Sequence, residues 1–270
     1  MDPTLERTLE KAWQSTCRVL FGQELGKLTE YREWLSEYLI KTSKRKSHVS
    51  GKDIILAMDA YPPSARFVSE DEVVQNRSYA LNINEIKDID SIIEALREKC
   101  EYTGNRFLGN SAFVESSDLV IDSQYVNNST NIEQSQYVDS SFMIRKSSKY
   151  VFGSGFLGEG EFLIHVVGAY NTKRSFESYF IPDSSDLYFC HSCYGCHNLM
   201  FSFGQRSAGY KIGNLQLPKE KYAALKAKLV SEVAYELKRS KEYSTLLDLV
   251  PPSLPASLPR LGLKAEKGAT

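Results

Sequence analysis

Long hydrophobic runs and a surplus of either charge are both missing from this 270-residue chain. No apolar stretch approaches the roughly 18 residues that would mark a membrane-spanning helix. The 33 basic and 34 acidic residues leave a net charge of −1, which excludes a general electrostatic attraction to nucleic acid or anionic lipid. The first residues also lack the charged-then-apolar layout of a secretory signal. We therefore expect a cytoplasmic protein that contacts no membrane.

Cysteine and histidine are scarce as well, with five and four residues respectively. Three of the cysteines lie within seven residues of one another, and Cys17 and Cys100 are remote, so the spacing does not support a disulfide framework. We interpret the cysteines as reduced thiols or metal ligands. With 42% hydrophobic and 25% charged residues, the chain can bury a core in one or two domains.

What the sequence does contain is a six-residue repeat. Small serines recur every six residues, and β-branched residues fall midway between them. The serines are Ser111, Ser117, Ser123, Ser129, Ser135, Ser141 and Ser147, and the β-branched residues are Val114, Val120, Val126, Ile132, Val138 and Ile144. A six-residue unit is too short to bury its own face, so it must stack on neighbouring coils. The repeat predicts a mainly β protein with a parallel β-solenoid over residues 106–216.

A second period of twelve residues overlies the first. The aromatic residues Phe113, Tyr125, Tyr137 and Tyr150 recur at intervals of twelve or thirteen, which predicts that their rings stack in a ladder on one face. This favours coils built from an even number of six-residue units, with triangular coils of three units as the alternative. A further copy of the repeat, SYFIPDS at 178–184, falls out of phase, which predicts an insertion near residues 168–174.

The chain on the N-terminal side of the repeat predicts a separate α/β region over residues 1–105. Apolar stripes indicate two helices within about 3–40, followed by a basic loop at 41–52 and a strand at 53–58. Ser91 and Glu94 form a capping box, which predicts a short helix from 91 to 100.

The chain after the repeat predicts a long helix over residues 217–249, opened by Leu217 and Pro218. Because the last coil of a solenoid has unpaired edge groups, we expect this helix to cap the open end. The proline-rich tail at 250–270 is read as an extended arm laid on a partner or as disordered.

The segment CHSCYGCH, residues 190–197, is the one cluster with metal-binding chemistry. Cys190, Cys193, Cys196 and His197, with His191 as an alternative, are ligands suited to a tetrahedral zinc site or to part of an iron–sulfur cluster. However, no second CxxC or HxxxH occurs in the chain, and the cysteines follow the three-residue rhythm of the solenoid. Because cysteine is small and often buried, the sequence favours core residues, with zinc as the alternative and otherwise no cofactor.

Two further patterns carry alternative functions. The basic residues Lys41, Lys44, Arg45 and Lys46 lie close enough together to contact an RNA backbone, although such loops are often only solvated. Hexapeptide solenoids resemble the acyltransferase family and the related zinc carbonic anhydrases, and in that family His165 would be the catalytic base. The aliphatic-glycine pairing of that family is absent here, and the apolar neighbours of His165 favour a structural role.

The last third of the chain resembles uncharacterised cysteine-containing β-solenoid proteins of uncultivated bacteria and archaea. The residues that carry the resemblance are Cys193, Cys196, Asn198, Leu199, Tyr210, Ile212, Asn214 and 219–222. The resemblance implies a cysteine-rich coil closed by a helix, and it implies no activity. This chain departs from that group because it lacks their additional cysteines and N-terminal zinc ribbons.

Taken together, the sequence favours a non-enzymatic interaction or assembly subunit of a larger complex. Other protein subunits are the expected partners, and homo-oligomers and RNA stay open as alternatives. An RNA- or ribosome-associated factor and a hexapeptide-type transferase or hydratase are the two alternative functions.

Overall fold

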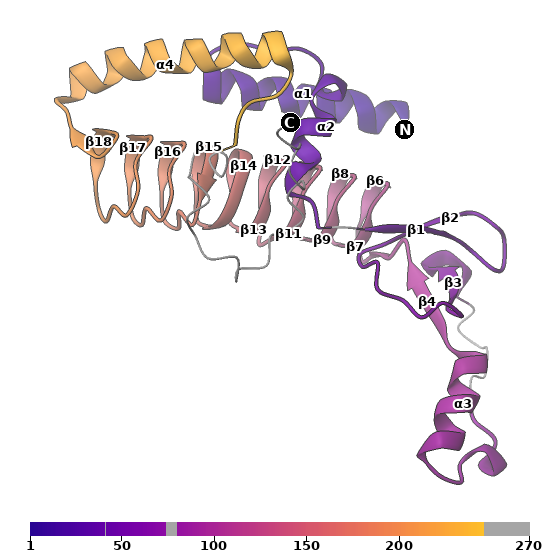
Figure 1. The fold of residues 1–270 in the computed structure, drawn as a ribbon. Coiled ribbons are helices and arrows are strands. Elements are labelled where there is room, and N and C mark those ends of the chain that lie inside the picture. Colours follow the sequence, from indigo (N-terminus) through magenta and orange to yellow (C-terminus); the bar gives the residue numbers. More distant parts are fainter. Residues whose placement is uncertain (41, 74–79, 246–270) are drawn as a thin grey trace, which may run out of the picture.

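In the computed structural model the chain forms a parallel β-solenoid with two long helices along one flank and a small arm at one end (Figure 1). The structure describes residues 1–40, 42–73 and 80–245. The solenoid has about nine turns, so the predicted fold class is confirmed. The tail predicted at 250–270 lies outside the described residues. None of the described helices is long and apolar enough to cross a membrane.

Each solenoid turn supplies two short strands, which stack in two rows. The first row contains β6 (Ala112–Glu115), β8 (Gln124–Asn127), β10 (Gln136–Asp139), β12 (Lys149–Phe152), β16 (Ser185–Tyr188), β17 (His197–Met200) and β18 (Gly209–Ile212). The second row contains β5 (Phe107–Leu108), β7 (Asp118–Ile121), β9 (Thr130–Glu133), β11 (Phe142–Arg145) and β13 (Gly155–Gly158). The longer strands β14 (Glu161–Tyr170) and β15 (Lys173–Tyr179) contribute to both rows.

One turn takes twelve residues. Gln124 pairs with Gln136, and Glu161 pairs with Lys173, in parallel register. The step is thirteen residues at two places: between Phe107 and Val120 at the start of the solenoid, and between Gln136 and Lys149, where the extra residue lies in a bend at 146–147. Two six-residue units therefore make each turn, as predicted. The predicted insertion at 168–174 is wrong, because SYFIPDS keeps the twelve-residue register and only occupies another side of the turn.

The bends follow a strict rhythm in which every third residue has a positive φ. Phe113, Ser116, Leu119 and Asp122 have φ values of 55°, 48°, 56° and 47°, so the chain bends four times in each turn. A left-handed conformation costs a side-chain-bearing residue about 1 kcal/mol. The stacking of neighbouring turns must offset this cost, since an isolated turn has no partner to hold it.

The residue after each bend points into the solenoid, which produces two kinds of interior ladder. Aliphatic residues such as Val120, Ile132 and Ile144 are at most 1% exposed. Serines fill other positions and hydrogen-bond between turns. The N–H of Ser129 donates to the Ser117 hydroxyl at 3.1 Å, and that hydroxyl donates to the carbonyl oxygen of Glu115. The buried backbone groups at the bends are thereby satisfied.

Two helices cover the outer side of the first row. In α1 (Pro3–Phe21), the Asp2 carboxylate accepts hydrogen bonds from the first amides, and the buried face packs on the strands. The ring of Trp13 lies 5.3 Å from that of Phe152, measured between centroids. Figure 1 shows α4 (Lys219–Ser240) running back over β18, β17 and β16 beside this helix.

The predicted position of the C-terminal helix is therefore wrong. It lies along the flank, because its buried residues Tyr222, Val233 and Leu237 join the same core as α1. The last turn is closed instead by β19 (Leu215–Gln216), which turns back and pairs antiparallel with β18.

The second predicted N-terminal helix is replaced by short turns. These are η1 (Leu28–Glu30), α2 (Arg32–Leu35) and η2 (Ser36–Tyr38). Leu28, Tyr31, Trp34, Leu35 and Tyr38 are all buried, so the segment turns repeatedly to place each of them on the solenoid.

The predicted basic loop is also wrong in part, because residues 43–46 form a strand. In this hairpin β1 (Ser43–Lys46) pairs antiparallel with β2 (Asp53–Leu56), whose predicted strand is confirmed. The sequence did not predict β1, because its last three residues are basic and exposed and only Ser43 is buried.

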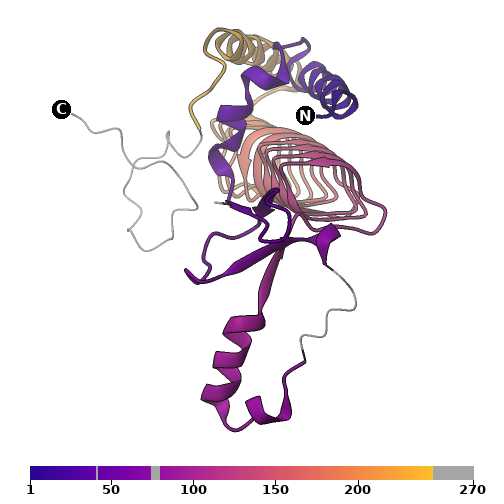
Figure 2. The ribbon, with the colours of Figure 1, turned by 90° about the vertical axis from the view of Figure 1, so that its right-hand side faces the viewer.

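The rest of the N-terminal region forms the arm. Strand β3 (Arg66–Ser69) pairs in parallel with β4 (Glu101–Gly104), and η3 (Glu70–Glu72) and η4 (Ile83–Glu85) lie between them in sequence. Helix α3 (Ile89–Lys99) begins two residues earlier than predicted, because Asp88 is its N-cap. Figure 2 shows α3 extending away from the solenoid, beyond the β1–β4 strands.

Candidate functional site

The three clustered cysteines line the inside of a single solenoid turn. Cys190, Cys193 and Cys196 are 0%, 0% and 2% exposed. Cys190 and Cys196 take the positions of Ser178 and Ser184 in the turn before, and Cys193 takes the position of Ile181. Their thiols lie 3.4, 3.5 and 3.3 Å from the carbonyl oxygens two residues before them, as the serine hydroxyls do. The amide of Ala208 in the next turn also donates to Cys196 Sγ at 3.5 Å. The cysteines thus act as members of the interior ladder.

The fourth predicted metal ligand lies elsewhere. His197 is exposed, and its ring meets that of Tyr210 edge-on at 5.4 Å between centroids on the outside of the solenoid. His191 is half-buried, and its Nδ1 lies 2.9 Å from the hydroxyl of Ser192. Among the described residues, no group of three or more His, Cys, Asp or Glu is placed to hold a metal ion. The structure therefore brings the three thiols together and separates them from the histidine, and zinc stays a prediction.

The protonation of these thiols follows from their surroundings. Burial raises the pKa of Cys190 well above its usual value, and it raises the pKa of Cys196 as well. The hydrogen bond with Cys190 lowers the pKa of Cys193. Cys190 and Cys196 are therefore neutral thiols at neutral pH. Cys193, whose pKa is lowered to about 7, is 0% exposed, so its sulfur does not meet solvent.

The predicted RNA-contacting residues lie on the β1–β2 hairpin. Lys44 Nζ and Lys46 Nζ lie 2.9 and 2.7 Å from the carboxylate oxygens of Asp53, so one acid partly neutralises two of the bases. The guanidinium of Arg45 lies 5.8 Å from the ring centre of Phe67. Lys41 lies outside the described residues. Binding of RNA here stays a prediction.

The residue predicted as a catalytic base in the hexapeptide alternative is enclosed. His165 and Glu177 are both 0% exposed, with His165 Nδ1 2.5 Å from Glu177 Oε1. The hydroxyl of Tyr38 donates to Glu177 Oε2 at 3.1 Å, and the rings of Trp34 and Tyr38 lie 4.1 and 4.5 Å from the His165 ring. His165 Nε2 has no hydrogen-bond partner among the described residues. This geometry fits a structural histidine that attaches residues 34–38 to the solenoid.

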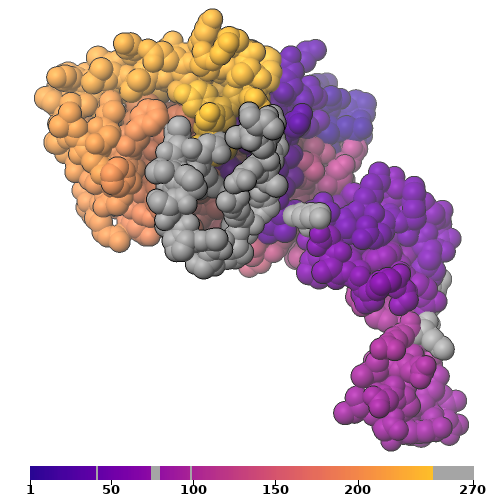
Figure 3. All heavy atoms as spheres, viewed as in Figure 1, coloured from indigo at the N-terminus to yellow at the C-terminus, as the bar shows by residue number. Residues whose placement is uncertain are grey.

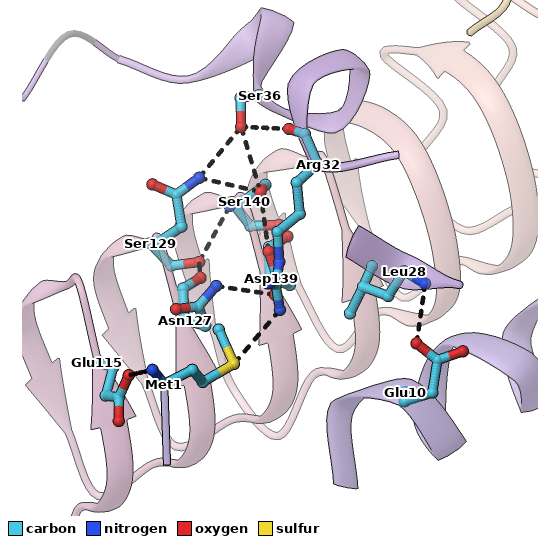
Figure 4. A network of polar contacts seen from close by, with 12 residues as sticks. Met1, Glu10, Leu28, Arg32, Ser36, Glu115, Asn127, Ser129, Asp139 and Ser140 are labelled. Atoms are coloured by element: carbon cyan, nitrogen blue, oxygen red, sulfur yellow. Dashed lines mark hydrogen bonds and ion pairs between the residues drawn. The ribbon is translucent and has the colours of Figure 1, made fainter. Parts of the chain in front are cut away.

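A second polar cluster attaches the same segment two turns before His165 (Figure 4). Arg32 Nε and Nη2 lie 3.2 and 3.1 Å from Asp139 Oδ2, and the Asn127 amide donates to the same oxygen at 3.0 Å. The Ser140 hydroxyl donates to Asp139 Oδ1 at 2.9 Å. Burial raises the pKa of Asp139, while Arg32 opposes that shift. Both polar clusters therefore attach the N-terminal segment to the solenoid.

The arm carries the one feature that packing does not explain. On and before α3, the apolar residues Ile86, Ile89, Ile93 and Leu96 are 49%, 74%, 43% and 46% exposed, and Ile83 is 77% exposed. The opposite face of α3 rests on η4: Ala95 is 9% exposed, and Lys99 Nζ lies 2.8 Å from Glu85. We call the residues Ile86, Ile89, Ile93 and Leu96 the α3 stripe. None of the described residues covers it, and Figure 3 shows α3 at the far end of the arm.

Neither models of known protein families nor curated proteins match this chain. Function is therefore argued from the geometry of the molecule. Sequence reasoning missed the α3 stripe, although its signal was present in the helical spacing of residues 86, 89, 93 and 96. An amphipathic stripe normally predicts a helix packed on the core of its own chain, and the sequence does not show that the helix stands clear.

Proposed function

We propose that this protein is a non-catalytic assembly subunit that docks another protein through α3. In this proposal the solenoid and its flanking helices are a rigid support, and the arm presents the α3 stripe. The observation that carries the proposal is the exposure of four consecutive stripe residues, each more than two-fifths exposed. Single exposed apolar residues are ordinary, but a contiguous row on a projecting helix marks an interaction site.

The interior of the molecule supports the non-catalytic part of the proposal. The inward positions between β7 and β17 are filled by aliphatic, serine and cysteine side chains. The groups with acid–base chemistry, His165 and Glu177, are sealed beneath Trp34 and Tyr38. A catalytic base must reach the proton that it abstracts, and these groups face packed side chains.

The test uses the full chain recovered under mild conditions from its native cells. The wild type is compared with a variant carrying Ile89→Asp and Ile93→Asp, which places two charges in the stripe. Val19→Asp is the matched control, because Val19 is 41% exposed on α1, away from the arm. Native mass and chemical cross-linking from Lys87 and Lys99, which flank the stripe, are then measured.

We expect wild type and Val19→Asp to run as a particle heavier than one chain, with cross-links from Lys87 or Lys99 to the docked polypeptide. The Ile89→Asp, Ile93→Asp variant should lose both the mass and the cross-links while keeping the circular dichroism of the wild type. A particle of unchanged mass in this variant, or a wild type found only as a single chain, would overturn the proposal.

A further inference from the structure

We infer that the protein docked on α3 is a second copy of this chain, and that the two α3 helices pair antiparallel across a two-fold axis. The inference rests on the proposed function, since it names the occupant of the same surface. Three observations carry it: the spacing of the stripe, the placing of two charges beside it, and the position of α3 on the arm.

The spacing of the stripe matches a single helical partner. Ile89, Ile93 and Leu96 lie on α3 at intervals of four and three residues, which is the pattern of a two-helix seam, and Ile86 precedes the helix by three residues. Such a seam is narrow: Asp90 and Arg97 border it on one side of α3, and the half-buried residues Ile92 and Lys99 border it on the other. A broad apolar groove would favour a wider apolar face on the helix that enters it.

Charge selects the direction of the pairing. Asp90 and Arg97 lie seven residues apart, so both flank the stripe on the same side, near opposite ends of α3. Both are exposed, and neither makes an ion pair with another described residue. In an antiparallel pair, Asp90 of each helix lies beside Arg97 of its partner, which forms two equivalent ion pairs. A parallel pair would not bring these residues together, and it would also align the two helix dipoles unfavourably.

The position of α3 at the end of the arm lets two copies pair without a clash between their solenoids. Figures 1 and 2 show α3 at the outer end of the arm, with the β1–β4 strands between it and the solenoid. A two-fold axis through the stripe therefore leaves the two solenoids on opposite sides of the contact. The interface is isologous, because each copy contributes the same residues.

The length of α3 limits the strength of this contact. Eleven residues span about 16 Å, so the buried area falls below that of a standard stable interface. We therefore expect a reversible dimer, with a dissociation constant of about 10 µM or weaker.

The experiment is sedimentation equilibrium of the purified full chain over a wide range of concentration, with charge exchange as the probe. Arg97→Asp places two carboxylates together, and Asp90→Arg places two guanidinium groups together, so each variant alone should weaken the dimer about tenfold. The double variant Asp90→Arg, Arg97→Asp should restore it. An equimolar mixture of the two single variants should also dimerise, because opposite charges then meet at both sites.

Several outcomes decide the inference. Three results together support it. The dimer should be lost in the Ile89→Asp, Ile93→Asp variant, kept in Val19→Asp, and recovered in the double charge variant. A wild type that stays monomeric at every concentration would overturn the self-pairing, and so would single charge variants that dimerise as well as the wild type. If the native particle still depends on α3 in that case, the proposed function survives with a different protein as the partner.

Discussion

The imidazole of His165 and the carboxylate of Glu177 lie in adjacent turns of the solenoid, with Nδ1 and Oε1 2.5 Å apart and both side chains fully buried. Their contact, together with the bond from Tyr38, ties the N-terminal segment to two turns at once. A buried polar cluster of this kind stabilises only while every member is present.

Replacing Glu177 with Ala should lower the free energy of unfolding by about 3 kcal/mol, because His165 and Tyr38 lose their shared buried acceptor. Urea denaturation followed by circular dichroism measures the change. Glu232→Ala is the control, since Glu232 is exposed on α4, and it should change the stability by less than about 0.5 kcal/mol. Equal effects of the two substitutions would contradict a structural role for the cluster.

Two glycines at left-handed bends on different corners of the turn should respond differently to alanine. Gly153 and Gly204 have φ values of 60° and 62°. A Cβ on Gly153 would lie 2.4 Å from His165 Cδ2 and 2.9 Å from the carbonyl oxygen of Leu35, whereas a Cβ on Gly204 meets nothing within 4 Å. Gly204→Ala should therefore cost about 1 kcal/mol from backbone conformation alone, and Gly153→Ala about 3 kcal/mol. Thermal unfolding of both variants tests this, and equal losses would show that the His165 corner is not tightly packed.

A serine of the interior ladder should be replaced by cysteine at a smaller loss of stability than by alanine. Ser141 Oγ accepts from the Ser154 amide at 3.2 Å and donates to the Asp139 carbonyl at 2.9 Å. Ser141→Ala should cost about 2 kcal/mol, because a buried amide is left without an acceptor. Ser141→Cys should cost less, since Cys190 fills the same position in a later turn, with its thiol 3.4 Å from the carbonyl oxygen of Tyr188. A cysteine variant less stable than the alanine variant would contradict this equivalence.

The same equivalence gives an expectation for metal content. Cys196→Ser should keep the fold, and the untagged wild type should contain far less than one zinc per chain by elemental analysis, because His197 faces away from the thiols. Zinc that is stoichiometric in the wild type and lost in Cys196→Ser would establish the metal site instead.

The raised pKa of Asp139 predicts a dependence of stability on pH. Because the folded carboxyl holds its proton at a higher pH than the unfolded one, the folded state binds more protons between the two pKa values, and stability falls as pH rises through them. Relative to Asp139→Asn, the wild type should therefore lose stability as the pH rises from about 4, the ordinary pKa of an aspartate, toward neutral. Urea titrations of both proteins across that range measure the difference. If the difference in stability between the two proteins does not change with pH, then Arg32 fully offsets the effect of burial on the pKa of Asp139.

Much of the solenoid could be predicted from sequence because its rules are local. Every third residue points inward, so the spacing of serine, valine and cysteine carries the register, and the same rhythm placed Cys190, Cys193 and Cys196 inside. The predicted ladder of Phe113, Tyr125, Tyr137 and Tyr150 is confirmed, with successive ring centroids 4.9, 5.4 and 4.9 Å apart. Phe162 extends it at 4.6 Å.

The positions of the helices could not be predicted in the same way. An apolar stripe predicts that one face of a helix is buried, but it does not predict the surface against which that face packs. For α4 the surface is the flank shared with α1, and for α3 the chain provides none among its described residues. Both outcomes depend on contacts between residues far apart in sequence, as the 206-residue separation of Tyr31 and Leu237, joined by a hydrogen bond, illustrates.

The twelve-residue register sets a unit of length for the whole molecule. Adding or removing one residue changes which side of the turn every later side chain faces, and the extra residue at 146–147 is absorbed only by two successive left-handed residues. Adding or removing one complete turn leaves all ladders in register and moves β18 by about 4.8 Å relative to the arm. Chains with this architecture would therefore differ in length by whole turns. The distance between the α3 contact and the closed end of the solenoid would then change in equal steps of one turn.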